Sequence, residues 1–338
     1  MTGITDVARE VGVSTATVSR ALRGLPRVSP ETRDRVLEVA HRMGYVASPH
    51  AASLAGGQTR AIGVVVPNVT RWFFGSIVHG AEELLRREGY DLLLYTVTGD
   101  AGARERLFHH HLQRKRVDAV MVLALRPTPD EVASLDRAGS PTVVVGGSVP
   151  GWSSVRIDDV EAAATAVRHL VELGHTRIAH LGGVPDPEHA GLDFSTTGER
   201  LVGYRTAMAE AGLHIEAGWE ATGDFTAQGG LTACRRLLAT ATRPTAIFAG
   251  SDEMAIGASH AVRAAGLRVP DDISVIGIDD HELSTYFDLS TIAQPAPELG
   301  RLGARTLLEA LGADPPLRPV DTILPTHLIA RGSTARVG

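Results

Sequence analysis

Arg20 carries the chemistry best suited to reading a base pair, because its planar guanidinium group matches the O6 and N7 acceptors of guanine. Ala16 lies four residues earlier, so the two side chains share one face of a short helix that starts after Ser14. A polar, basic face with small residues around it can approach base edges closely. The pattern therefore predicts a helix that enters the major groove of DNA.

Hydroxyl side chains surround this face and are suited to phosphate oxygens or to helix capping. Such contacts position a protein on DNA without specifying sequence. For Thr17 and Ser19, an ordinary place on the helix surface is the alternative. The residues in this group are Thr5, Ser14, Thr17 and Ser19.

Two short helices with a tight turn must position these side chains. Gly12 can take the positive φ that ends the first helix, and Ser14 is a good N-cap for the second. Two amphipathic surface helices of another domain would show the same bare pattern. The apolar residues recur at helical spacing and face inward: Ile4, Val7, Ala8 and Val11, then Val18, Ala21 and Leu22.

A third helix is expected to complete a small domain over residues 1–46. Ser29 would cap it, Pro30 occupies the favoured first position, and Gly44 would end it. Tyr45 would cover the core of this domain. Its apolar stripe comprises Val36, Leu37, Ala40 and Met43.

Residues 47–59 are expected to form a hinge helix or linker. Ser48 and Pro49 provide a helix start, and Gly56 and Gly57 close the segment. A helix this short is not stable alone in water.

The composition is that of a globular protein of two or three domains. The 338 residues are 43% hydrophobic and 21% charged, with a net charge of −6. Residues 1–60 carry eight arginines against five acidic residues, a net charge of +3, so the remainder carries −9. A basic head on an acidic body suits a DNA contact at one end. With no export signal, no membrane-spanning run and Cys234 as the single cysteine, we expect a cytoplasmic location.

From residue 61 onward, β-prone runs alternate with helical patterns. This alternation predicts parallel sheets with helices on both faces, arranged in two similar lobes that end near residues 158 and 293. Ligands of such folds bind at the carboxyl ends of the strands, and here also between the lobes. The expected strands are 62–66, 92–95, 119–123, 143–145, 178–181, 246–249 and 274–278; the expected helices are 77–87, 104–114, 199–211, 227–239 and 252–265.

The chain resembles the LacI/GalR family of bacterial transcription repressors over nearly its whole length. The motifs that carry the resemblance are Asp6-Val7-Ala8, Thr17-Val18-Ser19-Arg20, Val28-Ser29, Gly44-Tyr45, Leu54, Val66-Pro67-Asn68, Phe73-Phe74, Gly174-His175, Arg200, Gly203-Tyr204, Gly223-Asp224-Phe225, Pro244-Thr245-Ala246, Asp252, Val269-Pro270, Asp279-Asp280 and Gln294-Pro295.

The resemblance implies an all-α helix-turn-helix head joined by a hinge helix to a two-lobed α/β core similar to periplasmic sugar-binding proteins. The core would span residues 60–338, with one lobe at 60–158 and 294–321 and the other at 159–293 and 322–338. The chain would cross between the lobes near 157–160, 291–294 and 321–323. Members bind near-palindromic operators as dimers or pairs of dimers. A dimer is expected here, because no leucine heptad follows Arg331.

For DNA, the resemblance implies that Thr15, Ala16 and Arg20 read bases. Since the first two are small, much of the direct specificity would rest on Arg20. Leu54 would wedge into the minor groove at the operator centre and kink the duplex; packing of Leu54 on its own body is the alternative. The hinge departs from the family pattern at Ala47, Ser48 and Ala52.

For the effector, the resemblance implies a site between the lobes. Aromatic faces stack on the C–H surfaces of a sugar, and Arg and Asp bind hydroxyls in fork fashion. Buried Arg200 and Asp279 would need partners, which the ligand or each other would supply. Plain core packing is the alternative for Phe73 and Phe225. Arg71-Trp72 replaces the common Asn-Pro, and Ser251 stands where Asn is usual. The implied residues are Phe73, Phe74, Thr196, Arg200, Phe225, Ser251, Asp279 and Gln294.

The expected function is repression of sugar-utilisation genes, relieved by a small carbohydrate, with no cofactor. A corepressor-dependent regulator with a purine-like ligand is the alternative, followed by a sugar-binding receptor. An enzyme is not expected, because the G-x-S-x-G, GxxxxGK and HExxH motifs are absent. His109-His110-His111 occupy consecutive helical positions, which point in different directions and cannot converge on one metal ion.

Overall fold

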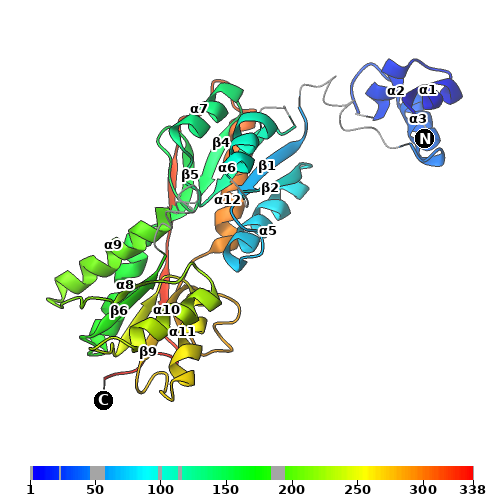
Figure 1. Cartoon of the computed structure of the whole chain (residues 1–338). Coiled ribbons are helices and arrows are strands. Elements are labelled where there is room, and N and C mark those ends of the chain that lie inside the picture. The colour runs from blue at the N-terminus through cyan, green and yellow to red at the C-terminus, as the bar shows by residue number, and fades with distance from the viewer. Residues whose placement is uncertain are drawn as a thin grey trace. The chain divides into compact units, whose positions relative to one another are not determined.

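The computed structural model describes residues 3–22, 24–45, 58–97, 101–112, 116–183 and 195–337. The chain separates into two units: residues 1–60 with 115–118, and the remainder of the chain. The helical part of the first unit is called the head, and the second unit the body (Figure 1). The expected hinge over residues 47–59, including Leu54, lies outside the described residues except for residues 58 and 59.

The head consists of three helices: α1 (Ile4–Val11), α2 (Thr15–Leu22) and α3 (Pro30–Arg42). Gly12 adopts φ +75° and ends α1, as expected. The side chain of Ser14 accepts a hydrogen bond from the Thr17 N–H at 3.1 Å, and that of Ser29 accepts one from Thr32 at 3.2 Å. Both expected N-caps are therefore present.

The core of the head is formed where the three helices meet. Leu37 is 46% exposed, so its expected place in the core was wrong, and Val39 is buried instead. Both lie within the apolar pattern of α3, and packing against α1 and α2 decides between them. Tyr45 packs against this core as expected. The buried members are Val7, Ala8, Val11, Val18, Ala21, Val36, Val39 and Ala40.

The first lobe of the body is built on a six-stranded parallel sheet in the order β11-β5-β4-β3-β1-β2. Its central strands are fully buried because helices cover both faces. The strands are β1 (Ala61–Val66), β2 (Asp91–Thr96), β3 (Ala119–Leu123), β4 (Thr142–Val145), β5 (Ser153–Ile157) and β11 (Asp321–Leu324).

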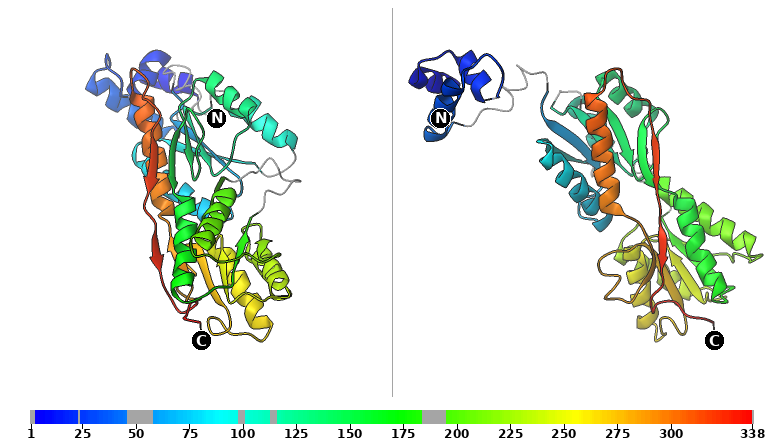
Figure 2. Two further views of the ribbon diagram at one scale, coloured as in Figure 1. Left: turned by 90° about the vertical axis from the view of Figure 1, so that its left-hand side faces the viewer. Right: turned by 180° about the vertical axis from the view of Figure 1, so that it is seen from behind.

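Helices α5 (Trp72–Arg87) and α12 (Ala296–Gly312) cover one face of this sheet (Figure 2). The other face carries α6 (Ala101–Arg106), the π-helical turn η1 (Leu107–His111) and α7 (Pro129–Ala138). A single helix was expected over residues 104–114. The segment instead begins earlier and changes from α to π geometry after Arg106.

The second lobe repeats this plan with the order β12-β10-β9-β8-β6-β7, in which only β12 is antiparallel to its neighbour. Helices α8 (Asp159–Glu172) and α9 (Ser195–Glu210) lie on one face, and α10 (Ala227–Leu238) and α11 (Asp252–Ala264) on the other (Figure 2). The strands are β6 (Ile178–Gly182), β7 (Glu220–Thr222), β8 (Ala246–Ala249), β9 (Ser274–Asp279), β10 (Ser290–Ala293) and β12 (His327–Ile329).

Glycines allow the helices that share a face to approach closely. A Cβ on Gly300 of α12 would overlap the carbonyl oxygen of Ile77 in α5. A Cβ on Gly257 of α11 would overlap the carbonyl oxygen of Ala227 in α10. The same device therefore fixes a helix pair in each lobe.

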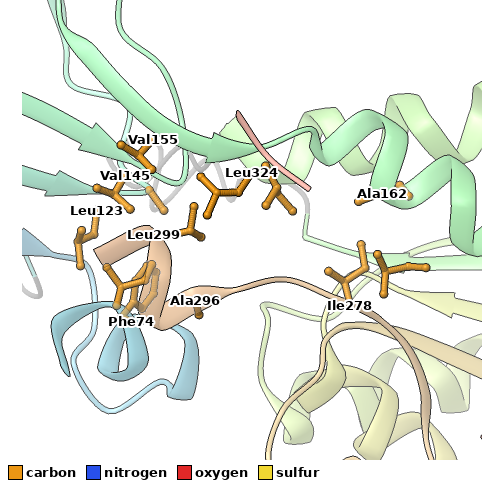
Figure 3. Packing of buried hydrophobic residues seen from close by; sticks show 14 of the residues in the cluster. Phe74, Leu123, Val145, Val155, Ala162, Ile278, Ala296, Leu299 and Leu324 are labelled. Carbon is orange, nitrogen blue, oxygen red and sulfur yellow. The ribbon is translucent and has the colours of Figure 1, made fainter. Parts of the chain in front are cut away.

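The chain passes between the lobes three times: after β5, after β10, and between β11 and β12. The third crossing was expected near residues 321–323. Because Leu324 still pairs with Ile157 in the first sheet, the crossing follows Leu324. One hydrophobic cluster includes residues of both lobes, from Phe74 and Leu299 on one side to Ala162 and Ile278 on the other (Figure 3). No helix in the described residues is long and apolar enough to span a bilayer.

Candidate DNA-binding face and effector cleft

The outward face of α2 is the candidate DNA-reading surface. Thr15, Ala16 and Arg20 are all exposed, whereas Val18 and Ala21 of the same helix are buried. The side chain of Arg20 makes no hydrogen bond or ion pair with another described residue. Its guanidinium group is therefore free to bind an acceptor that the head does not provide.

Three other arginines of the head bind partners within the head. The Arg42 side chain forms an ion pair with Glu10 at 2.8 Å, and Arg9 forms one with Asp6 at 3.2 Å. The Arg35 guanidinium donates to the carbonyl oxygen of Val11 at 2.6 Å, which ties α3 to the end of α1. Arg20 thus differs from these three residues in lacking an internal partner.

The four predicted hydroxyl residues of the head do not share one role: two hold the turn before α2, and the other two differ in exposure. The Ser14 and Thr17 side chains hydrogen-bond to each other at 2.9 Å, beside the cap that Ser14 makes on α2. Thr5 on α1 is exposed, and Ser19 is half-buried. Ser14 and Thr17 are therefore part of the turn itself, while Thr5 remains open to solvent.

In the body, unusual backbone conformations gather after the strands. Asp224 and Phe225, two and three residues beyond β7, have φ of 51° and 59°. Asp279, the last residue of β9, has φ of 141°, and Asp280 has φ of 56°. In the first lobe Ala124, directly after β3, has φ of 45°. Such conformations cost of order 1–3 kcal/mol each in side-chain-bearing residues and are typical of functional sites.

Arg200, on α9 of the second lobe, forms a buried ion pair. Its Nε donates to Asp159 Oδ1 at 2.7 Å, and its Nη1 donates to the carbonyl oxygen of Gly250. Burial raises the pKa of Asp159, while the positive charge of Arg200 opposes this change. Arg200 was expected to pair with a ligand or with Asp279; its partner is Asp159, the first residue of α8.

Asp279 has a different partner. The side-chain amide of Gln294 donates to Asp279 Oδ1 at 2.6 Å, and both residues are buried. Burial raises the pKa of Asp279, and the carboxylate of Asp252 raises it further, while Arg200 lowers it. A carboxyl group with a raised pKa can donate as well as accept a hydrogen bond, which suits the hydroxyl group of a ligand.

Asp252, the first residue of α11, accepts three hydrogen bonds from segments that follow it in the second lobe. Its Oδ1 accepts from the Thr291 hydroxyl at 2.7 Å, and its Oδ2 accepts from the Ser284 hydroxyl at 2.7 Å and from the His281 N–H at 2.9 Å. These bonds connect α11, β10 and the loop after β9. They fix the backbone next to Asp279.

The aromatic residues of the site have unequal burial. Phe74 is buried in the core of the first lobe, whereas Phe73 is half-buried beside Gly146 and Ala124, which follow β4 and β3. Their rings meet edge to face at a centroid distance of 5.5 Å. Phe73 therefore lies at the carboxyl ends of the strands.

On the second lobe, Phe225 lies against Gly183, after β6. Thr197 also lies against Gly183 and is buried, whereas Thr196, the predicted residue, is half-buried. Ser251 is buried and caps α11 by accepting from the Met254 N–H at 3.3 Å. Its hydroxyl is thus engaged in the fold.

Sequence reasoning missed Asp159 as the partner of Arg200 and Asp252 as a structural centre. It also missed two contacts between the lobes: an ion pair between Arg71 and Glu253 and a ring contact between Trp72 and His281. The sequence offered two signals for these contacts. One is the acidic residue that begins each of the helices α8 and α11, and the other is the departure from the family pattern at Arg71-Trp72. None of these signals gives the partner, because each partner lies 29 or more residues away along the chain.

Two family models match the chain. The model for bacterial regulatory proteins of the lacI family matches residues 3–48, and the model for a periplasmic binding protein-like domain matches residues 167–334. The chain is 37% identical to the ribose operon repressor of Escherichia coli (strain K12), over 98% of this chain and 100% of that protein.

Solved structures give the same result for the fold. The lac repressor dimer bound to operator and the anti-inducer ONPF matches with a TM-score of 0.86 and 28% identity, over 99% of both chains. A complex of the transcriptional regulator CelR with cellobiose matches with a TM-score of 0.74 and 32% identity, over 98% of this chain and 100% of that chain. The chain belongs to the LacI family of bacterial regulatory proteins and is a DNA-binding transcriptional repressor of that family.

Proposed function

We propose that this repressor is a homodimer that controls sugar-utilisation genes and leaves a near-palindromic operator when a small neutral carbohydrate fills the cleft between its lobes. The observation that carries the proposal is the buried set of Arg200, Asp159, Asp279 and Gln294 at the carboxyl ends of the second-lobe strands.

The chemistry of this set favours an uncharged polyhydroxyl ligand. Sugar hydroxyls both donate and accept hydrogen bonds, so they can bind to a carboxyl group, an amide and a guanidinium group at once. The half-buried rings of Phe73 and Phe225 provide apolar surfaces of the kind that stack on sugar C–H groups. Asp159 already neutralises the one buried arginine of this set, so a phosphorylated ligand would find no uncompensated positive charge there.

On the DNA side, the exposed and unpaired Arg20 supports direct reading of a guanine. Thr15 and Ala16 add small surfaces next to it. Thr5 would bind a phosphate, and Ser14, Thr17 and Ser19 would hold the turn and contact the backbone nearby. Leu54 would enter the minor groove at the operator centre.

Exposed apolar residues support a dimer. Tyr286 is 85% exposed in the segment after β9, next to exposed Phe287. At the edge of the first-lobe sheet, Leu93 and Leu94 of β2 are exposed as well. Large exposed apolar side chains that lie close together are typical of association surfaces.

The ligand would act by preferring one arrangement of the lobes. A ligand shifts such an equilibrium only by its differential affinity for the two arrangements. Closure around Arg200 and Asp279 would favour the arrangement that does not fit the operator. Release is the expected direction, because genes for using a sugar need expression when that sugar is present.

The test is fluorescence anisotropy of the full-length protein on a labelled promoter fragment from its own gene neighbourhood, with random DNA as competitor. Ribose, cellobiose and a purine base are titrated into the bound complex. Release by a sugar supports the proposal, while tighter binding with a purine would favour a corepressor mechanism. Arg200→Lys, which keeps a positive charge beside Asp159 but removes the guanidinium fork, should bind the operator and no longer respond to the sugar.

A further inference from the structure

An ion pair links the two lobes directly. Arg71 Nη1 lies 3.0 Å from Glu253 Oε2, with side chains 30% and 23% exposed. Arg71 is the N-cap residue of α5 in the first lobe, and Glu253 is the second residue of α11 in the second. The pair is therefore shielded from solvent more than a typical surface ion pair.

Trp72 follows Arg71 in the sequence, and its ring contacts the ring of His281 in the second lobe. Trp72 and His281 have ring centroids 4.9 Å apart and planes inclined by 36°. His281 is buried, and its Nδ1 accepts from the Leu283 N–H at 2.9 Å. The backbone N–H of His281 donates to Asp252. These two hydrogen bonds hold the imidazole in the position where it contacts Trp72.

Each of these four residues lies within two positions of a candidate ligand residue in the chain. Arg71 and Trp72 precede Phe73, Glu253 lies two residues after Ser251, and His281 lies two residues after Asp279. A movement that separates the lobes must break both contacts, and it would carry Phe73 away from Asp279.

We propose that Arg71, Trp72, Glu253 and His281 form a clasp, which closes the lobes on each other and positions Phe73 and Asp279 for the effector. This inference rests on the proposed effector site, but the closing itself does not require a ligand. The clasp residues are positioning residues, since they act through the groups next to them. Opening the clasp would admit the ligand, and closing it would retain the ligand.

The first experiment measures closure in the ligand-free, full-length protein. Trp152 and Trp219 are buried, whereas Trp72 is half-buried, so the difference in acrylamide quenching between the wild type and Trp72→Phe reports on Trp72. We expect Arg71→Ala and Glu253→Ala each to increase this quenching. The charge-swapped double variant Arg71→Glu with Glu253→Arg should restore it towards the wild-type value.

Arg86→Ala is the matched control, because Arg86 lies on the same helix and pairs with Glu82 within the first lobe. It should leave the quenching of Trp72 unchanged. Equal quenching in the wild type, Arg71→Ala and Glu253→Ala would overturn the clasp, as would a charge-swapped variant as open as the single variants. Either outcome leaves operator binding by the wild type intact, so it is distinct from failure of the proposed function.

The second experiment measures kinetics with ribose and cellobiose as probes, by stopped-flow fluorescence. For whichever sugar binds, Arg71→Ala should increase the dissociation rate constant by roughly two- to fivefold, the range expected for one partly shielded ion pair. The association rate constant should stay equal or rise. A lower association rate with unchanged dissociation would contradict a clasp that retains the ligand.

Discussion

Arg200 Nε lies 2.7 Å from Asp159 Oδ1, and both side chains are only 5% exposed. The pair joins α9 to the first residue of α8, next to the first crossing between the lobes. A buried guanidinium group needs such a partner, because an isolated buried charge is very costly. With Nε bonded to Asp159 and Nη1 bonded to the carbonyl oxygen of Gly250, the guanidinium group is fixed in orientation at the candidate site.

Breaking this pair from one side should destabilise the body strongly. Asp159→Asn leaves a buried, uncompensated positive charge, and we expect a loss of roughly 3–5 kcal/mol in the free energy of unfolding. Urea unfolding followed by circular dichroism measures this loss. Arg205→Ala is the control, since Arg205 pairs with Glu220 at the surface, and its loss should cost below about 1 kcal/mol. Equal effects of the two substitutions would contradict the assignment.

Removing Arg20 should reduce both affinity and selectivity for the operator. We expect Arg20→Ala to cost about 1–3 kcal/mol at the operator and to flatten the preference at one base pair, because a fork contact to guanine is lost. A gel-shift series on single-base operator variants measures this. Arg9→Ala, also on the head surface, should at most weaken binding uniformly. Unchanged base discrimination in Arg20→Ala would remove Arg20 from this role.

A methyl group at the close approach of α5 and α12 should destabilise the first lobe. Gly300→Ala forces a Cβ onto the backbone oxygen of Ile77, and overpacking of this kind costs about 1–3 kcal/mol. Gly312→Ala, at the exposed end of the same helix, meets nothing and should be neutral or slightly stabilising. Thermal unfolding compares the two variants. A Gly300→Ala protein as stable as Gly312→Ala would show that the helices can separate freely.

Acid should destabilise the second lobe through His180. Its ring lies between Tyr204 and Phe248, at centroid distances of 5.2 and 4.9 Å, and burial lowers the pKa of His180 to about 4. A lowered pKa contributes stability that is present above pH 6.5 and is lost as the pH falls towards 4. Its share of the loss between pH 7.5 and 5.0 should be about 2 kcal/mol.

Urea unfolding at both pH values, at one protein concentration, tests this prediction. His180→Gln should be less stable at pH 7.5 but should lose less on acidification than the wild type. His110→Gln, at an exposed position, should follow the wild type. Burial also lowers the pKa of His169, His175 and His281. These residues therefore contribute to the loss of stability in acid both in the wild type and in His180→Gln. Identical pH dependence in His180→Gln and the wild type would contradict the prediction.

The elements that local sequence dictates were predictable. Capping residues such as Ser14 and Ser29, and the apolar periodicity of residues 4–22, act within a few positions, and the structure confirms them. The buried strands β3 and β8 were predicted with the observed limits, because continuous apolar runs between turns are typical of central parallel strands.

Elements that depend on distant partners were not predictable. Strand β10 carries Ser290 and Thr291, which are polar yet buried, because their hydroxyls bond to the carbonyl oxygen of Arg331 and to Asp252. Likewise, nothing near Arg200 indicates that its partner lies 41 residues earlier in the chain. Such pairs are set by the tertiary fold.

The most direct measurement is the affinity of the full-length protein for a promoter fragment from its own gene neighbourhood, with and without saturating sugar, at moderate salt and against random DNA. The proposed function predicts selective binding to the fragment, loss of that binding when a neutral sugar is added, and persistent binding in the same sugar by Arg200→Lys, which keeps a positive charge beside Asp159. Equal affinity for the promoter fragment and for random DNA, with no effect of any carbohydrate, would contradict it.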